Sequence, residues 1–95
     1  MSGDEVPAVV PTAQFFRALA AQLATQTEVD LFIQAELEAI LTLFGRHYDQ
    51  LRKTDGVAEL SSSGKLGVDW TVFGRRDSDG TYRISYIQLK RSNES

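Results

Sequence analysis

The chain has 95 residues, of which 42% are apolar and 24% charged, and it contains no cysteine. This composition is typical of one small globular domain, and it excludes disulfides and Cys-ligated zinc. The N-terminus is acidic, and no run approaches the roughly 20 apolar residues of a transmembrane helix. We therefore expect a cytoplasmic protein that has no signal peptide and does not bind membranes.

The formal net charge of −3 is divided unevenly along the chain. Residues 1–45 carry six acids and one base, a net charge of −5, whereas residues 46–95 carry nine bases and seven acids, a net charge of +2. A strong non-specific nucleic-acid binder needs a much more basic surface. The charge alone argues slightly against DNA as the partner.

The first part of the sequence predicts an arm and a helix. Residues 1–10 show no periodicity and are expected to form a flexible arm. Thr12 is the expected N-cap of a helix of about 12–14 residues, whose apolar stripe includes the adjacent Phe15 and Phe16. Apolar surface in excess of what a small sheet can bury would indicate a protein partner or a homodimer.

A second helix is predicted from a start signal at Thr27, the expected N-cap. It is expected to run from Glu28 to about Lys53, and the Asp55-Gly56 pair supplies the stop signal. Its apolar stripe is longer than one neighbouring helix can cover, so we expect this helix to pack on a sheet as well.

The C-terminal part predicts strands of a small sheet, joined by short turns. In chain order, the expected segments are a short strand at 57–60, a mobile serine-rich loop at 61–64, a strand at 66–75, a turn at 77–80 and a strand at 81–89. The predicted fold class is α+β, with two N-terminal helices packed on a small, mainly antiparallel sheet that ends in a β-hairpin. Residues 11–92 would form one domain, and residues 93–95 a tail.

The last two predicted strands carry the only residues that suggest a chemical site: Asp69, Gln88 and Lys90. The register of the hairpin decides whether they meet, because a slip of one residue turns a strand's side chains to the other face. A two-residue turn at Asp79-Gly80 would place Asp69 opposite Lys90. A two-residue loop at Ser78-Asp79, or a four-residue loop at 77–80, would place it opposite Gln88, and a three-residue loop would separate it from both.

Gly67-Val68-Asp69, followed by a hydrophobic strand, a turn and the sequence Gln88-Leu89-Lys90-Arg91, resembles the PD-(D/E)XK nuclease superfamily. The likeness is to its Mrr-like restriction branch, in which the strand motifs read G-V-D and Q-x-K. It extends over residues 67–91, about a quarter of the chain. The resemblance implies a metal-dependent endonuclease that acts on DNA.

The resemblance also implies a role for each matching residue. Asp69 would ligate Mg²⁺, and Gln88 would offer a side-chain or neighbouring backbone oxygen to the same ion. Lys90 would position or activate the attacking water and steady the scissile phosphate. The family places a glutamate on the preceding helix, for which Glu36 and Glu38 are the candidates, with Glu36 favoured.

This sequence departs from the family pattern after Lys90, because the family's core continues there with a helix and a further strand. A partner chain that completes the fold, a degenerate relative and an accidental match are the alternatives. Asp69 and Lys90 also permit a plainer interpretation as a cross-strand ion pair, worth at most about 1 kcal/mol at a surface.

Two functions are therefore expected from the sequence. The first is a nuclease-like module for DNA, whether active, incomplete or inactive. The second is a small non-catalytic protein-interaction or regulatory module, as a monomer or a homodimer, that acts through the first helix and the sheet edge.

Overall fold

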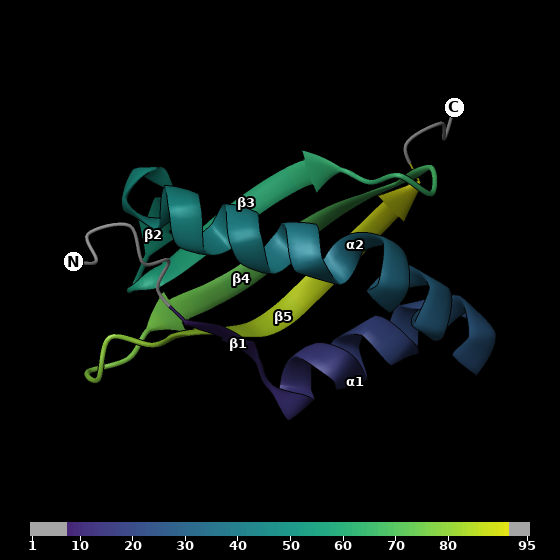
Figure 1. The fold of residues 1–95 in the computed structure, drawn as a ribbon, viewed down its shortest axis with the longest axis horizontal. Helices are drawn as coiled ribbons and strands as arrows, with labels where there is room; N and C mark the ends of the chain where they lie inside the picture. Colours follow the sequence, from purple (N-terminus) through teal and green to yellow (C-terminus); the bar gives the residue numbers. More distant parts are fainter. Residues whose placement is uncertain (1–7, 92–95) are drawn as a thin grey trace.

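The computed structural model describes residues 8–91, which form two α-helices and one five-stranded sheet (Figure 1). In chain order the elements are β1 (Val9–Pro11), α1 (Ala13–Gln22), α2 (Gln26–His47), the 3₁₀ helix η1 (Tyr48–Gln50), β2 (Arg52–Thr54), β3 (Val57–Ser63), β4 (Val68–Arg76) and β5 (Tyr82–Arg91). The strand order is β1-β5-β4-β3-β2, and only the β1–β5 pair is parallel. The expected α+β class is confirmed.

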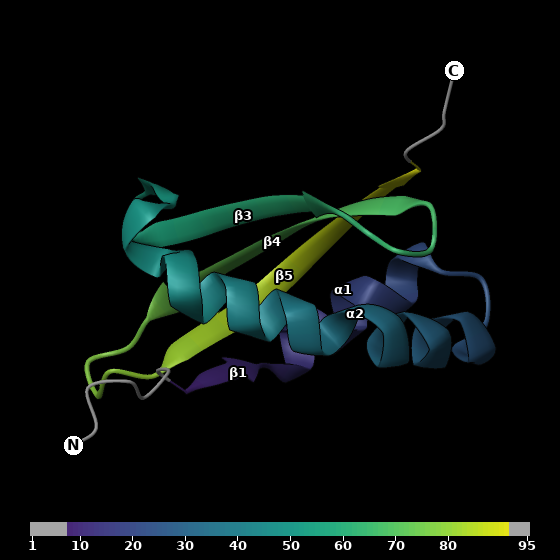
Figure 2. The same cartoon turned by 45° about the horizontal axis from the view of Figure 1, so that its top comes forward.

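The elements form two layers, with α2 lying across one face of the sheet and α1 lying beside β5 (Figures 1 and 2). Phe32, Ile40 and Phe44 of α2 are buried in the core. Trp70 and Ile87 are among the buried residues of the sheet. The opposite face, which we call the open face, carries mostly exposed residues, and none of the helices in the described part of the chain covers it.

Both helices begin at threonine caps. Thr12 Oγ1 accepts a backbone N–H in the first turn of α1, as expected. The second cap is Thr25 and not Thr27, because Thr25 accepts the N–H of Glu28 while the Glu28 carboxylate accepts the N–H of Ala24. This reciprocal arrangement, close to a capping box, starts α2 two residues earlier than predicted.

The predicted end of the second helix is wrong. The helix ends at His47, and Lys53 belongs to β2, from where its ammonium donates to the carbonyl of Tyr48. Asp55 and Gly56 both have positive φ, 53° and 81°, and form the two-residue turn between β2 and β3. The pair predicted as a helix stop is thus a hairpin signal, because an Asp-Gly pair suits both roles.

Two segments predicted to be irregular contain strands. Val9 and Val10, assigned to the flexible arm, lie in β1, while residues 1–7 and the predicted tail lie outside the described residues. β3 continues to Ser63, so three of the four residues of the expected serine-rich loop are in a strand. Both errors arise because pairing with a neighbouring strand outweighs local preference.

Helix α1 does not present the surplus apolar surface that the sequence suggested. Its Phe15 and Leu19 are fully buried, and Phe16 packs against Phe15 with ring centroids 5.2 Å apart. The exposed large apolar residues of the described chain lie outside α1; they are Val10, Leu31, Leu66 and Tyr86. In residues 8–91 no helix is long and apolar enough to cross a membrane.

Candidate functional site

The register of the β4–β5 hairpin brings three of the predicted site residues onto one face. Asp69 lies directly opposite Lys90, and Gln88 lies opposite Thr71, two residues farther along β4. Directly opposed residues in an antiparallel pair point to the same side of the sheet. Asp69, Gln88 and Lys90 therefore share the open face.

A β-bulge produces this register. A five-residue loop at 77–81 joins the strands and pairs Arg76 with Tyr82, a register that would place Asp69 opposite Leu89 if it continued unchanged. Instead the register shifts by one residue at Ser85, which has no Cα partner on β4. The bulge restores the shared face that an odd-length loop would have destroyed.

The sequence did contain a signal for the bulge, at Gly74. A glycine inside a strand pattern often marks a bulge or a close approach of another backbone. A Cβ at Gly74 would lie 2.9 Å from Ile84 Cα and 3.0 Å from Phe44 Cζ, closer than ordinary van der Waals contact allows. Loop length alone, on which the predicted register depends, does not reveal this bulge.

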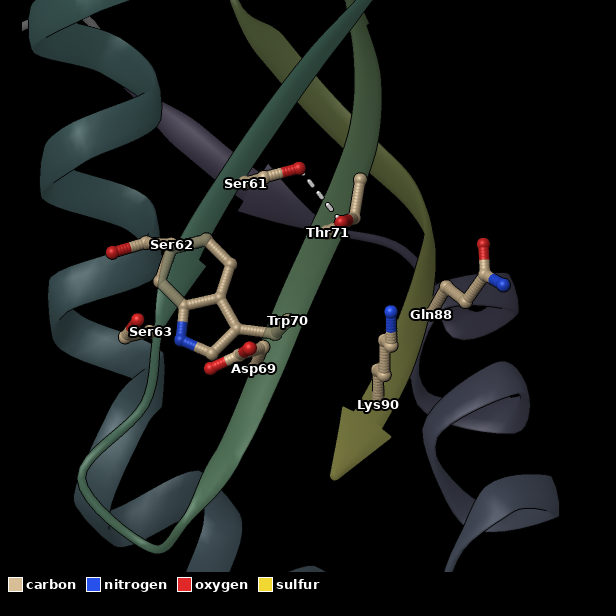
Figure 3. Close-up of a pocket in the computed structure, with 8 residues that line it drawn as sticks. All are labelled: Ser61, Ser62, Ser63, Asp69, Trp70, Thr71, Gln88 and Lys90. Atoms are coloured by element: carbon tan, nitrogen blue, oxygen red, sulfur yellow. Dashed lines mark hydrogen bonds between the residues drawn. The ribbon is translucent and has the colours of Figure 1, made fainter. Parts of the chain in front are cut away.

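A hollow with a volume of about 460 Å³ surrounds these residues (Figure 3). It is lined by Ser61, Ser62, Ser63, Asp69, Trp70, Thr71, Gln88 and Lys90. The hydroxyls of Ser61 and Thr71 are hydrogen-bonded to each other at 2.7 Å. Asp69 Oδ1 and Trp70 Nε1 are buried and have no hydrogen-bond partner among the described residues. Both residues line the hollow, Asp69 from the open face and Trp70 from the core side of β4.

Asp69 and Lys90 do not form the cross-strand ion pair that their positions would allow. Within residues 8–91, the ion pair that is present joins Arg83 to Asp77 at the other end of the hairpin. Figure 3 shows the Asp69 carboxylate turned toward β3, while the Lys90 side chain runs along its own strand. The carboxylate is therefore left free on the side that faces β3.

Glu36 lies outside the hollow, as does Glu38, which is exposed on α2. Only 2% of Glu36 is exposed, and its carboxylate accepts the backbone N–H of Lys65 in the loop between β3 and β4. A Cβ on Gly64 would lie 2.8 Å from Glu36 Oε2, so glycine leaves room for the carboxylate. Glu36 is held against this loop and is not brought together with Asp69, Gln88 and Lys90.

The hollow offers a divalent cation few ligands. Asp69 provides its one carboxylate, and Gln88 adds an amide oxygen. No group of three or more His, Cys, Asp or Glu side chains in residues 8–91 is placed to hold a metal ion. Mg²⁺ would have to complete its six oxygen ligands with water or with a bound phosphate. The feature that fits a cation is the buried Asp69 oxygen without a partner.

The aromatic residues of the hairpin divide between the core and the open face. Trp70 and Tyr82 are buried, so they are not available to stack on nucleic-acid bases. Phe73 and Tyr86 are directly opposed on the open face with ring centroids 5.9 Å apart, and 46% of Tyr86 is exposed. This one aromatic pair is a small stacking surface.

Beyond the end of β1, a side chain that no sequence motif indicates pairs with part of the outer edge of β5. β1 pairs with β5 over Tyr82–Ile84. Farther along, the Gln22 amide donates to the Ile87 carbonyl at 2.7 Å and accepts the Leu89 N–H at 2.8 Å. Gln22 thus takes the place of a neighbouring strand where β1 has ended.

The outer edge of β3 is closed only in part. β2 pairs with Val57–Glu59 and reaches no farther. Gly64 donates to Val68 on β4, and the direction of the backbone groups alternates along a strand. The N–H and C=O groups of Ser61 and Ser63 therefore point away from β4, where none of the described residues pairs with them. We call these four backbone groups, the N–H and C=O of Ser61 and of Ser63, the free edge.

No protein-family model matches the chain, and neither a curated protein nor a solved structure matches it.

Proposed function

We propose that this chain is a small, non-catalytic protein-interaction module that binds an extended segment of a partner along the free edge of β3. The observation that carries the proposal is the contrast between the two outer edges. Gln22 pairs with the Ile87 carbonyl and the Leu89 N–H of β5 beyond the end of β1, whereas the outward backbone groups of Ser61 and Ser63 have no partner among the described residues. Addition of a strand to such an edge is a common mode of peptide recognition.

The surroundings of the free edge suit an incoming strand. Serine side chains are small and uncharged, and they provide none of the lysine, proline or inward-pointing charge that usually blocks an exposed edge. Every second side chain of an added strand would point to the open face, beside the hollow. Main-chain hydrogen bonds would then supply affinity, and the hollow would supply selectivity.

The proposal is tested by a proline scan of the edge. Ser61→Pro removes an outward N–H and leaves the bonds between β3 and β4 in place, because proline is tolerated where the N–H faces solvent. Peptides selected from a displayed library of short linear sequences should bind the natural chain, and Ser61→Pro should weaken that binding by at least about tenfold. Ser61→Ala, which removes only the hydroxyl, should bind normally.

Ser63→Pro, which removes the other outward N–H, is the second variant if Ser61→Pro does not fold. Amide spectra and unfolding midpoints like those of the natural chain would establish that a variant is folded. A folded proline variant that binds the peptides as tightly as the natural chain would refute the proposal. A mass that rises with concentration and falls in the proline variants would identify the added strand as a second copy.

A nuclease-like module that acts on DNA with Mg²⁺ is a second candidate. One observation favours it: Asp69, Gln88 and Lys90 line one hollow, and the buried Asp69 oxygen has no partner. Asp69 and Gln88 would hold the ion, whose role would be to neutralise charge on a phosphate. Glu36 would take no part, since it lies outside the hollow.

A metal titration tests this second candidate. Mg²⁺ or Mn²⁺ is added to labelled protein while backbone amide shifts are followed, and plasmid cleavage is assayed under the same conditions. The candidate expects saturable shifts at Asp69 and Gln88 that disappear in Asp69→Ala. An absence of response at millimolar metal, with the plasmid intact, would remove it.

A further inference from the structure

The free edge and the unpartnered Asp69 oxygen together define what kind of segment binds. Resting on the proposed function, we infer that the strand added to β3 carries a lysine or arginine side chain opposite Ser63, and that this side chain binds the Asp69 carboxylate. The partner would thus be an extended segment with one basic residue at a fixed position.

The geometry follows from the row of residues across the sheet. Ser63 lies opposite Asp69, and Asp69 lies opposite Lys90, all on the open face. Neighbouring strands are about 4.8 Å apart, so a residue opposite Ser63 on an added strand would lie about 10 Å from Asp69, measured between backbones. A long basic side chain can span this distance over a residue as small as serine. The Asp69 carboxylate is turned toward β3 (Figure 3).

The electrostatics favour a basic side chain at this place. Asp69 Oδ1 is buried without a hydrogen-bond partner, and a charged donor would form a strong, charge-assisted hydrogen bond with it. Lys90 carries the same charge as an incoming cation, but it lies on the far side of Asp69 from β3. The requirement is therefore for positive charge approaching from the free edge.

The neighbouring position along the added strand should be less selective. A residue opposite Ser61 would lie over the Ser61 and Thr71 hydroxyls, which are hydrogen-bonded to each other. No charged residue is opposite Thr71, since Gln88 occupies that place on β5. One basic residue, and not a basic run, is the expected signature.

A double-mutant cycle with a selected peptide tests the inference. The probe is the tightest-binding peptide recovered from the displayed library, labelled with a fluorophore. Asp69→Asn, or replacement of the peptide's basic residue by alanine, should each weaken binding by at least about tenfold. The two changes together should cost little more than either alone, because each removes the same contact. Glu59→Gln, which neutralises an acid on β3 itself, should leave binding unchanged.

The outcomes separate this inference from the proposed function. One outcome would overturn the inference alone: peptides whose binding is lost in Ser61→Pro, and which therefore use the free edge, but which carry no basic residue at a fixed position. The same holds if a folded Asp69→Asn variant binds the peptide normally. If no recovered peptide depends on the free edge, the proposed function and the inference fall together.

Discussion

Glu36 has a structural role that its position in the sequence does not reveal: it holds the loop between β3 and β4 against α2. It lies on the stripe of α2 that faces the sheet, between the buried Phe32 and Ile40. Its carboxylate reaches the loop between β3 and β4 and accepts the Lys65 N–H. A buried acid generally requires such a partner, so Glu36 fixes this loop to the helix.

We predict that Glu36→Ala will lower the free energy of unfolding by about 1–3 kcal/mol, because it leaves a partly buried backbone N–H without its acceptor. Urea unfolding followed by circular dichroism measures the change. The matched control is Glu38→Ala, an exposed position on the same helix, which should change the stability by no more than about 0.5 kcal/mol. Equal effects of the two substitutions would contradict the role given to Glu36.

Asp79, in the loop between β4 and β5, provides a pH prediction. The Thr81 N–H donates to its carboxylate at 2.9 Å and lowers the pKa of Asp79, and Arg83 contributes in the same direction. A lowered pKa in the folded state means that the ionised form stabilises the loop above the unfolded pKa. That contribution is lost as the pH falls through the folded pKa.

The carboxyl carbon shift of Asp79, followed by NMR from neutral pH downward, should therefore have its midpoint below the ordinary value of 3.8. The Thr81 amide resonance should move with the same midpoint. In Asp79→Asn the Thr81 amide should no longer titrate there. A midpoint at or above the ordinary value would show that the hydrogen bond is absent in solution.

At the scale of elements, the outer side of β5 beyond the end of β1 can be compared with the outer side of β3 beyond the end of β2. Gln22→Ala should leave the Leu89 N–H exposed to solvent, because within residues 8–91 the Gln22 amide is the partner of this N–H. Loss of a hydrogen bond worth about 1 kcal/mol corresponds to roughly fivefold faster hydrogen exchange at Leu89. Gln14→Ala, an exposed substitution on the same helix, should leave this rate unchanged. Unaltered exchange in Gln22→Ala would show that the edge is protected by other means.

The elements differ in how far the sequence could predict them. α1 and the hairpin were predictable, because the Thr12 cap, the apolar stripe and the turn at 77–80 are local signals. β1 was not, since three residues ending in Pro11 have no periodicity and become a strand only beside β5. β2 was hidden because Asp55-Gly56 also suits the end of a helix.

The candidate site could be predicted in its residues but not in its geometry. Asp69, Gln88 and Lys90 were identified from their motif, and the structure places them on one face. The bulge at Ser85 that secures this arrangement lies beside Gly74, which approaches the Ile84 backbone and the Phe44 side chain closely. Phe44 comes from a distant part of the chain, so this close approach is not a local signal. The free edge was equally hidden, because it depends on where β2 stops.

At the scale of the whole molecule, the acidic and the more basic parts of the sequence do not form two separate domains. The acidic N-terminal half supplies α1 and α2, and the more basic C-terminal half supplies β2 to β5, so the two are layered on each other in one fold. The helix layer is therefore the more acidic one, and the sheet is the more basic one. A partner that approaches the open face meets mainly residues of the more basic half.

The parallel pairing of β1 with β5 also has a consequence for how the chain folds. Thr12, just after β1, donates to the carbonyl of Ile84, 72 residues away. Contacts between such distant residues slow folding, because a long loop must close before they form. During synthesis, β1 and the apolar side of α1 must wait until β5 has left the ribosome. In that interval β1 lacks the strand with which it pairs in the fold, and Phe15 and Leu19 of α1 lack part of their buried environment.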